Sequence, residues 1–353
     1  MDKQKLLRAA KSLQGQFGSE WTTIVQTLGT ENLRRRAGKD LTSFIAFPER
    51  EKGGSATWRG NCSPQTVAAI LQYVMDAKRY YRRDLSGFTL LDPMSGSGTS
   101  LAAADSLGVK SVLYDLNPNP AHGIGGWNAL KDDVEHDADC IFFHPPYHSI
   151  IQYSGRMWGD EPHPDDLSQC ESYEEFLDKL NYVIKKLYMA LRKDGRMAIL
   201  VGDVRKNGRF YSIQNDIMTL GQMEGFIVKG QYNCASDNRR YSTPFIPIVT
   251  EYIILLKKEG GLVIPFTRRV SGTFNMLQFD NSAVTWNHLV RNVLESKGGK
   301  ATAEEIYALL ENHPKAQGRR HFRERIRAVI QEYPDLYRHV GRGVYQLAYP
   351  VAA

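Results

Sequence analysis

The fold is decided by the stretch Phe88-Thr89-Leu90-Leu91-Asp92-Pro93-Met94-Ser95-Gly96-Ser97-Gly98-Thr99. Its first four residues are a β-type, mainly apolar run, and its two glycines let the following backbone turn tightly and approach a ligand closely. The alanine-rich residues 100–107 predict a helix, and Gly108 predicts its end. The stretch therefore predicts a strand, a glycine turn and a helix whose N-terminus meets a ligand.

The pattern around the glycine turn narrows the class of ligand. It lacks the G-x-G-x-x-G spacing of dinucleotide sites, and the chain contains no G-x-x-x-x-G-K-[ST] phosphate loop, which disfavours nucleoside triphosphates. A second apolar run, 111–114, ends on Asp115, at about the 20-residue spacing where a carboxylate commonly binds a ribose diol. We expect a ligand that contains a nucleoside, with a loop cap as the alternative role of Asp115.

A third apolar run, 140–143, leads into His144-Pro145-Pro146-Tyr147. Two consecutive prolines fix φ at about −65° and remove two backbone donors, so the chain cannot continue as a central strand. Tyr147 can stack on a planar base, while the side chain of His144 and the backbone carbonyls can accept hydrogen bonds from an exocyclic amine. This proline elbow predicts a site for an amine-bearing base at the same sheet edge as the glycine turn.

The two motifs resemble those of the S-adenosylmethionine-dependent amino-methyltransferases that act on adenine N6 and cytosine N4 in DNA. In that family D-P-F-x-G-S-G-T binds the methionine part of the cofactor, and [D/N/S]-P-P-[Y/F] holds the target amine beside the methyl sulfonium. This chain departs at Met94, where the family has an aromatic residue, and at His144. The resemblance covers roughly residues 57–258. Ser63-Pro64 before a helix resembles the family's motif that closes over the cofactor.

The resemblance implies an α/β fold of the class I methyltransferase type, Rossmann-like, with a seven-stranded, mostly parallel sheet and helices on both faces. The implied cofactor is S-adenosyl-L-methionine, and Asn128, or Asp132 or Asp133 beside it, is expected at the adenine ring. The implied cofactor-binding residues are Ser63, Pro64, Asp92, Pro93, Met94, Gly96, Gly98, Thr99, Asp115, Leu116 and Asn128, and the implied catalytic residues are His144, Pro145, Pro146 and Tyr147.

His144 decides how the elbow would work. A neutral imidazole has one acceptor nitrogen and can orient an amino group, whereas an imidazolium cannot, so activity should fall at acid pH. The alternative is a branch of the family with lost or altered chemistry. Because few residues separate the two motifs, no large recognition domain is inserted between them, and target recognition must come from elsewhere in the chain.

The C-terminal part has a pattern of its own. Residues 286–294, 302–310 and 319–331 read as three helices, the second capped by Thr302 with Glu305 three residues later, and 337–347 read as a hairpin. This order resembles a winged helix that binds nucleic acid, with a charged helix of a protein-interaction domain as the alternative. The residues expected to contact DNA, chiefly its phosphates, are Arg319, Arg320, Arg323, Arg327 and Arg342.

The predicted organisation has four parts: an N-terminal helical and basic segment (1–55), the methyltransferase domain (56–265), a linker (266–282) and the winged-helix-like domain (283–350). The formal net charge is +6 with a pI of about 9.0, and residues 315–342 hold eight Lys or Arg against three acidic residues. Such a patch attracts phosphates. For the basic cluster Arg34-Arg35-Arg36, nucleic-acid contact and a solvated linker are equally favoured.

The composition indicates the general class of protein. An apolar content of 42% supports a globular core, and no run reaches the roughly 20 apolar residues that span a bilayer. The start of the chain lacks a secretory core, so we expect a cytoplasmic protein with no membrane partner. The four cysteines are scattered, which predicts reduced thiols and no metal.

The sequence therefore favours a DNA methyltransferase that modifies an exocyclic amine of a flipped-out adenine (N6) or cytosine (N4). Its partner is then DNA, with RNA less favoured, and a homodimer or a cognate restriction or defence partner is left open. Two alternatives stay open: an RNA base amino-methyltransferase, and a cofactor-binding but non-catalytic subunit that binds nucleic acid. Basic charge alone does not separate the three.

Overall fold

The computed structural model describes residues 41–47, 53–55, 58–81, 84–231, 246–260, 264–268 and 284–350. Most of the predicted N-terminal segment, including the basic cluster at 34–36, lies outside the described residues. Most of the predicted linker lies outside them as well, since only 266–268 of it are described.

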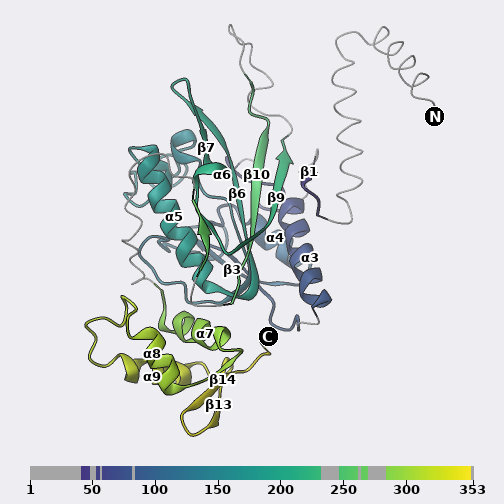
Figure 1. Ribbon diagram of the computed structural model, residues 1–353. Coiled ribbons are helices and arrows are strands. Elements are labelled where there is room, and N and C mark those ends of the chain that lie inside the picture. Colours follow the sequence, from purple (N-terminus) through teal and green to yellow (C-terminus); the bar gives the residue numbers. More distant parts are fainter. Residues whose placement is uncertain are drawn as a thin grey trace, which may run out of the picture.

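A single large sheet forms the centre of the molecule, in the strand order β1-β9-β10-β6-β5-β2-β3-β4, with β7 paired to β6 (Figure 1). Neighbouring strands are parallel except for β10, which is antiparallel to β6 and β9, and β7, which is antiparallel to β6. The strands are β1 (Phe44–Ala46), β2 (Thr89–Asp92), β3 (Lys110–Asp115), β4 (Ile124–Gly125), β5 (Ala138–Phe143), β6 (Leu191–Lys206), β7 (Arg209–Ser212), β9 (Gln222–Gly230) and β10 (Thr250–Lys257).

Helices cover both faces of this sheet. The helix α5 (Tyr173–Ala190) packs on one face through a core that includes Phe176, Leu180 and Ile184. On the other face, α3 (Pro64–Tyr80) and α4 (Thr99–Ser106) pack on a second core with Val67, Ile70 and Leu90. The expected α/β fold class, with a mostly parallel sheet between helices, is confirmed. The expected number of strands is wrong, because the sheet has nine strands in the described ranges and not seven. Strands β1, β4 and β7 were not expected from apolar runs, because they are short or exposed.

The central strands β2 and β5 are buried at every residue, as strands covered on both faces must be. Most of their side chains are apolar, with Thr89, Asp92 and Asp139 as the exceptions, so their sequences contain short apolar runs. Both strands end at the same edge of the sheet, β2 at Asp92 and β5 at Phe143, so the glycine turn and the proline elbow leave the sheet side by side. This carboxyl edge is the one on which the site is built.

Smaller elements complete the α/β part. One-turn helices lie at His148–Ile150 and Leu167–Gln169, and α6 is Ile213–Asp216. The strands β8 (Thr219–Leu220) and β11 (Phe266–Thr267) form a separate two-stranded sheet. No helix of the described ranges is both long and apolar enough to span a bilayer.

The C-terminal residues form a unit with its own core, built around Trp286, Val290 and Ile326. It contains α7 (Trp286–Ser296), α8 (Ala303–Leu310) and α9 (Phe322–Glu332), with a three-stranded antiparallel sheet in the order β12-β14-β13, whose strands are β12 (Lys300–Thr302), β13 (Tyr337–Gly341) and β14 (Val344–Leu347). The capping box of Thr302 and Glu305 is present as expected. The winged-helix identity of this unit stays a prediction.

One detail of the predicted third helix is wrong. The helix begins at Phe322 and not at Arg319, so Arg319 and Arg320 precede it. The reason is local: Gly318 has a left-handed φ of 72°, and the Arg319 N–H donates to the carbonyl of Ala316 at 3.1 Å in a turn. Only Arg323 and Arg327 of the expected arginines lie on α9.

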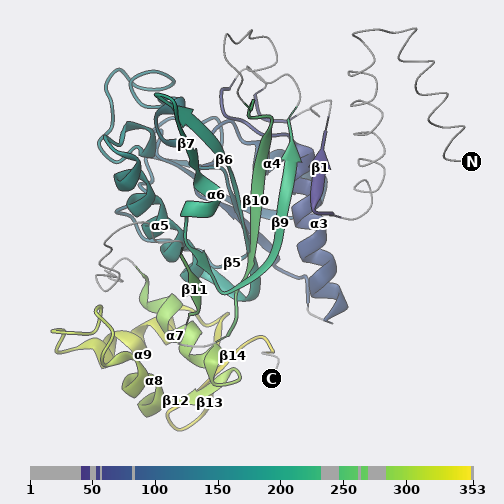
Figure 2. The same ribbon diagram turned by 45° about the horizontal axis from the view of Figure 1, so that its top comes forward.

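The C-terminal unit docks on the amino ends of the strands through buried charges. Arg291 on α7 lies 2.5 Å from Asp137, the residue that precedes β5, and it donates to the carbonyl of Leu191 at 2.6 Å. His288 adds a contact of 2.9 Å to the same carboxylate. Figure 2 shows the unit at one end of the sheet and the paired ends of β6 and β7 at the other.

Candidate active site

The glycine turn joins β2 to α4 in a conformation that only glycine adopts without strain. Gly96 and Gly98 have φ values of 49° and 80°, and Gly98 is the N-cap of α4. A side chain at position 98 would also clash, since a Cβ on Gly98 would lie 2.3 Å from the ring of His122. The turn is held by a hydrogen bond from the Gly98 N–H to the Ser95 carbonyl at 2.9 Å.

Two buried carboxylates hold the turn in place. Asp92 accepts a hydrogen bond from the Met94 N–H at 3.0 Å and another from the Ser100 hydroxyl. Burial raises the pKa of Asp92 to about 7. Asp115, at the end of β3, accepts from the Gly96 N–H at 2.7 Å, and burial raises its pKa as well. The end of the neighbouring strand thus fixes the turn directly.

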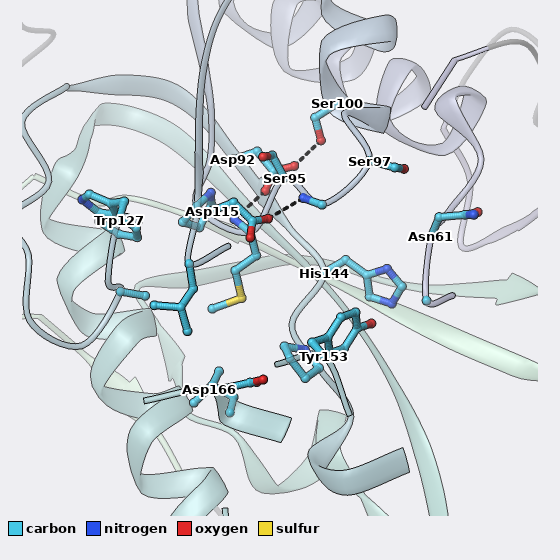
Figure 3. Close-up of a pocket in the computed structure, with 18 of the residues that line it drawn as sticks. Asn61, Asp92, Ser95, Ser97, Ser100, Asp115, Trp127, His144, Tyr153 and Asp166 are labelled. Atoms are coloured by element: carbon cyan, nitrogen blue, oxygen red, sulfur yellow. Dashed lines mark hydrogen bonds between the residues drawn. The ribbon is translucent and has the colours of Figure 1, made fainter. Parts of the chain in front are cut away.

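A pocket opens between the turn, the elbow and the segment 58–62, with about 930 Å³ of empty space including its mouth. Figure 3 shows Trp127 on one side of the pocket and His144 on the other. The predicted site residues that line it are Asp92, Pro93, Met94, Gly96, Thr99, Asp115, Leu116, His144 and Pro146.

Other predicted residues lie beside the pocket and not in its lining. Ser63 is the N-cap of α3 and Pro64 its first residue, and the neighbouring Asn61 and Cys62 line the pocket in their place. In this region the residues that line the pocket therefore precede the two expected ones in the chain. The role of Ser63 and Pro64 in binding a cofactor stays a prediction. Gly98 caps α4 and does not line the pocket.

The side of the pocket near Trp127 is formed by the loop after β4. The Trp127 indole stacks on Tyr114 with ring centroids 4.6 Å apart, and its N–H donates to the Asp133 carbonyl at 3.1 Å. The Asn128 amide donates to Asp165 at 2.8 Å, and the Asp132 carboxylate accepts from the Asn128 backbone N–H at 2.7 Å. Asn128 and Asp132 therefore shape this loop, while Trp127 and Asp165 line the pocket.

Two serine hydroxyls of the turn have unused hydrogen-bonding capacity. Ser95 and Ser97 are buried and line the pocket, and neither hydroxyl has a hydrogen-bond partner among the described residues. Leaving a buried polar group unpaired costs free energy, so these two hydroxyls would gain from hydrogen bonds to a polar ligand in the pocket. In the described ranges no group of side chains could hold a metal ion.

The elbow positions His144 through a chain of buried polar groups. The Tyr147 hydroxyl donates to Glu251 Oε1 at 2.8 Å and lies 2.8 Å from His144 Nε2. Lys229 Nζ donates to the other oxygen of Glu251 at 2.6 Å. Lys229 and Glu251 are register partners on β9 and β10. Gly202 on β6 leaves room for this arrangement, because a Cβ there would lie 3.0 Å from the Tyr147 ring.

This chain of contacts determines which nitrogen of His144 carries the hydrogen. The single hydrogen of the Tyr147 hydroxyl is donated to Glu251, so its oxygen can only accept from His144. His144 Nε2 is therefore the protonated nitrogen, and Nδ1 keeps a lone pair. The Lys229 ammonium holds the pKa of Glu251 below its usual range against the opposing effect of burial, which keeps this acceptor ionised.

Burial lowers the pKa of His144 to about 4, and the Lys229 ammonium acts in the same direction, against the opposing charge of Glu251. The imidazole is thus neutral at pH 7, the form that can accept a hydrogen bond. Burial and the Glu251 charge raise the pKa of the Tyr147 phenol well above its ordinary value, so it remains a donor. The side chain of Tyr147 is not part of the pocket lining, and its stacking on a base stays a prediction.

Lys229 and Glu251 were missed by sequence reasoning, since neither lies in or near a motif. The basic residues of β6 and β7 were missed too, although Asn207-Gly208 is a strong hairpin signal. The expected arginines Arg323, Arg327 and Arg342 are exposed, and Arg323 lies over the Tyr307 ring at 5.2 Å. Arg319 and Arg320 are exposed in the preceding turn.

Comparison with known proteins gives structural likenesses alone. No protein-family model and no curated protein matches the chain. Among solved structures, TehB from Haemophilus influenzae is 12% identical over 54% of this chain and 63% of its own, with a TM-score of 0.31. A candidate DNA modification methylase from Thermus thermophilus is 26% identical over 28% of this chain and 43% of its own, with a TM-score of 0.20.

A third likeness is an amino pentose methyltransferase of calicheamicin biosynthesis from Micromonospora echinaspora, solved with S-adenosylmethionine bound. It is 13% identical over 43% of this chain and 62% of its own, with a TM-score of 0.26. The chain thus spans less than two thirds of the length of each of the three. At these TM-scores the likenesses decide neither the reaction nor the substrate of this chain.

Proposed function

We propose that the protein is an S-adenosylmethionine-dependent methyltransferase that modifies the exocyclic amine of a DNA base, adenine at N6 or cytosine at N4. The observation that carries the proposal is the meeting of the glycine turn and the proline elbow in one pocket, with a neutral His144 at the elbow. The family resemblance of both motifs supports the same reaction. The target base would be flipped out of the duplex, because its amine is otherwise inaccessible to a buried site.

The residues of the pocket fit the cofactor. The hydroxyls of Ser95 and Ser97 are available to its polar groups, and Trp127 offers an aromatic surface at the far side from the elbow. Asp115 lines the pocket where a ribose diol is expected, although its two oxygens also accept the N–H groups of Gly96 and Asn117. When bound, the cofactor supplies an electrophilic methyl group carried by a sulfonium.

His144 would orient the amine of the target base. Its Nδ1 lone pair can accept one amino hydrogen, and the Pro145 carbonyl can accept the other, which directs the nitrogen lone pair out of the hydrogen-bonded plane. Lys229, Glu251 and Tyr147 would act as positioning residues, since they hold His144 in the tautomer with a free Nδ1. Alignment of the amine beside the methyl group would supply most of the rate enhancement.

A transfer assay with methyl-labelled S-adenosylmethionine tests the proposal. We expect label in DNA at neutral pH with the wild-type chain, and loss of label with His144→Ala at unchanged cofactor affinity. Label in RNA but not in DNA would favour an RNA base methyltransferase. Cofactor binding in calorimetry without label in either polymer would favour a non-catalytic subunit.

A further inference from the structure

The expected DNA-contacting arginines and the pocket lie at opposite edges of the sheet. The C-terminal unit contacts Asp137 and Leu191, which precede or begin β5 and β6, whereas His144 follows the other end of β5. Six residues of strand separate these ends, a distance on the order of 20 Å at about 3.3 Å per residue. A base seated in the pocket therefore needs contacts from other residues at the carboxyl edge.

A two-stranded hairpin projects from that edge. It consists of residues 203–212, in which β6 pairs with β7 from Asp203↔Ser212 to Lys206↔Arg209. Asn207 and Gly208 form its turn with φ values of 51° and 76°, the geometry of a tight hairpin. Since Phe143 pairs with Ile199, Lys206 lies seven residues beyond the end of β5, on the order of 20 Å outward. We call these residues the β6–β7 hairpin.

The hairpin carries positive charge and an exposed aromatic ring. Its sequence contains three basic residues and one acidic residue, which are Arg205, Lys206, Arg209 and Asp203. Phe210 is 50% exposed, and the Arg205 guanidinium lies 5.6 Å from its ring centroid. Cationic side chains contact phosphates, and an arginine on an aromatic ring offers a flat surface for stacking on bases. Both features favour contact with nucleic acid.

The hairpin is anchored beside the elbow. Lys206 Nζ donates to the Ser149 hydroxyl at 2.6 Å, and Ser149 follows Tyr147 by two residues. Tyr211 packs on Tyr173 with ring centroids 4.5 Å apart, which fixes the base of the hairpin to α5. Its position relative to the pocket mouth is therefore set by direct contacts, as a recognition element requires.

We propose that the β6–β7 hairpin is the element that contacts DNA at the catalytic edge. A two-stranded β-ribbon fits the major groove, which is about 12 Å wide. Arg205 and Arg209 contact phosphates or base edges, and Phe210 packs against bases beside the extruded nucleotide. This inference rests on the proposed function, because it takes DNA as the substrate. The arginines of the C-terminal unit then reach only duplex that lies farther from the target base.

Fluorescence anisotropy with a labelled duplex of about two turns, roughly 20 base pairs, tests this assignment. The variants are Arg205→Ala/Arg209→Ala and Phe210→Ala. The matched control is Arg79→Ala/Lys110→Ala, which removes two exposed positive charges at the opposite edge, where Lys110 opens β3. Cofactor affinity, measured by calorimetry, reports that each variant is folded.

The double arginine variant should weaken binding at least tenfold and make the plot of log K against log salt concentration shallower by about 1.8, since each phosphate contact contributes about 0.9. Phe210→Ala should weaken binding without changing this slope, and the control should match the wild type. Hairpin variants that bind the duplex like the wild type would overturn the inference, as would a wild-type chain that binds RNA but not this duplex.

The two proposals fail in different ways. If the hairpin variants lose DNA binding but the wild-type chain transfers no methyl label, the hairpin assignment stands and the proposed reaction is wrong. If label enters DNA equally with wild-type and hairpin variants, the reaction stands and the hairpin assignment is wrong.

Discussion

Tyr147 donates a hydrogen bond of 2.8 Å to Glu251, a residue 104 positions later in the chain. The bond links the proline elbow to β10, the antiparallel strand that lies between β9 and β6. Because the phenol hydrogen points to Glu251, the phenol oxygen accepts from His144 and leaves Nδ1 of that ring as an acceptor. The chemistry of the elbow therefore depends on a residue outside every recognisable motif.

Replacing Glu251 by Gln should reverse the direction of the hydrogen bond between His144 and Tyr147. Lys229 only donates, so the Gln oxygen would face Lys229 and its NH₂ group would face Tyr147. Tyr147 would then donate to His144 Nε2 and move the ring hydrogen to Nδ1. We expect methyl transfer to fall roughly 100-fold at an unchanged cofactor affinity, a loss typical of removing a positioned proton acceptor.

Glu224→Gln is the matched control, because Glu224 pairs with Arg196 at 2.9 Å away from the pocket. Single-turnover rates at saturating cofactor compare the two variants. Equal rates for Glu251→Gln and the wild type would show that the tautomer of His144 has no role.

The pH dependence of methyl transfer follows from the lowered pKa of His144. An ordinary histidine would lose half of its neutral form at about pH 6.5, whereas this one does so at about pH 4. Activity at saturating cofactor should stay level from pH 8 to about pH 5 and then decline. Over the same interval the unfolded chain binds a proton that the folded site does not, so this group lowers stability as the pH falls from about 6.5 to 4.

Rates of label transfer across this range test the expectation, with unfolding midpoints measured in the same buffers. A midpoint of activity near pH 6.5 would mean that His144 titrates as an exposed residue, in conflict with its buried position.

The Asp115 carboxylate joins the glycine turn to β3, and its replacement by Asn should weaken cofactor binding. An amide has one acceptor oxygen and would turn its NH₂ group toward the N–H of Gly96 or of Asn117. Hydrogen bonds to charged groups contribute about 1.5–3 kcal/mol, so Kd should rise roughly 10- to 100-fold. Asp105→Asn on the exposed side of α4 is the control, and calorimetry with S-adenosylmethionine is the measurement. Equal Kd values for Asp115→Asn and the wild type would show that Asp115 does not contribute to cofactor binding.

The central strands and the two motifs were predictable from the sequence because β2, β3 and β5 are short and each contains a buried apolar run. Their ends fix where the turn and the elbow meet, so the part of the pocket formed by these two motifs followed from local patterns. Trp127, Tyr153 and Asp165 line the rest of the pocket and were not expected. The helix boundary at Phe322 was missed because residues 319–321 fit a helical pattern but belong to the turn that follows Gly318.

The chain of contacts from Lys229 to His144 could not be predicted, because it depends on the register of β9 against β10. No local spacing reports that Lys229 faces Glu251, or that Gly202 makes room for Tyr147. The placement of the C-terminal unit depends likewise on Arg291 and Asp137, which are far apart in sequence and ordinary in isolation.

Arg291 should be essential for attaching the C-terminal unit. It is fully buried, and Arg291→Met would remove the cation that lies beside Asp137. It would also remove one of the two donors to the carbonyls of Met189 and Leu191, to which Lys258 donates as well. Removing one partner of a buried pair typically costs about 3–5 kcal/mol. The exposed pair of Arg325 and Glu332 makes Arg325→Met the control, with an expected loss below about 1 kcal/mol. Urea unfolding distinguishes them, and equal losses would contradict a buried docking contact.

Mass spectrometry of nucleosides from DNA tests the central claim most directly. DNA from cells that express the wild-type chain should contain N6-methyladenine or N4-methylcytosine, and DNA from cells that express His144→Ala should contain neither above background. Absence of both modified bases with a folded, cofactor-binding wild-type chain would contradict the account.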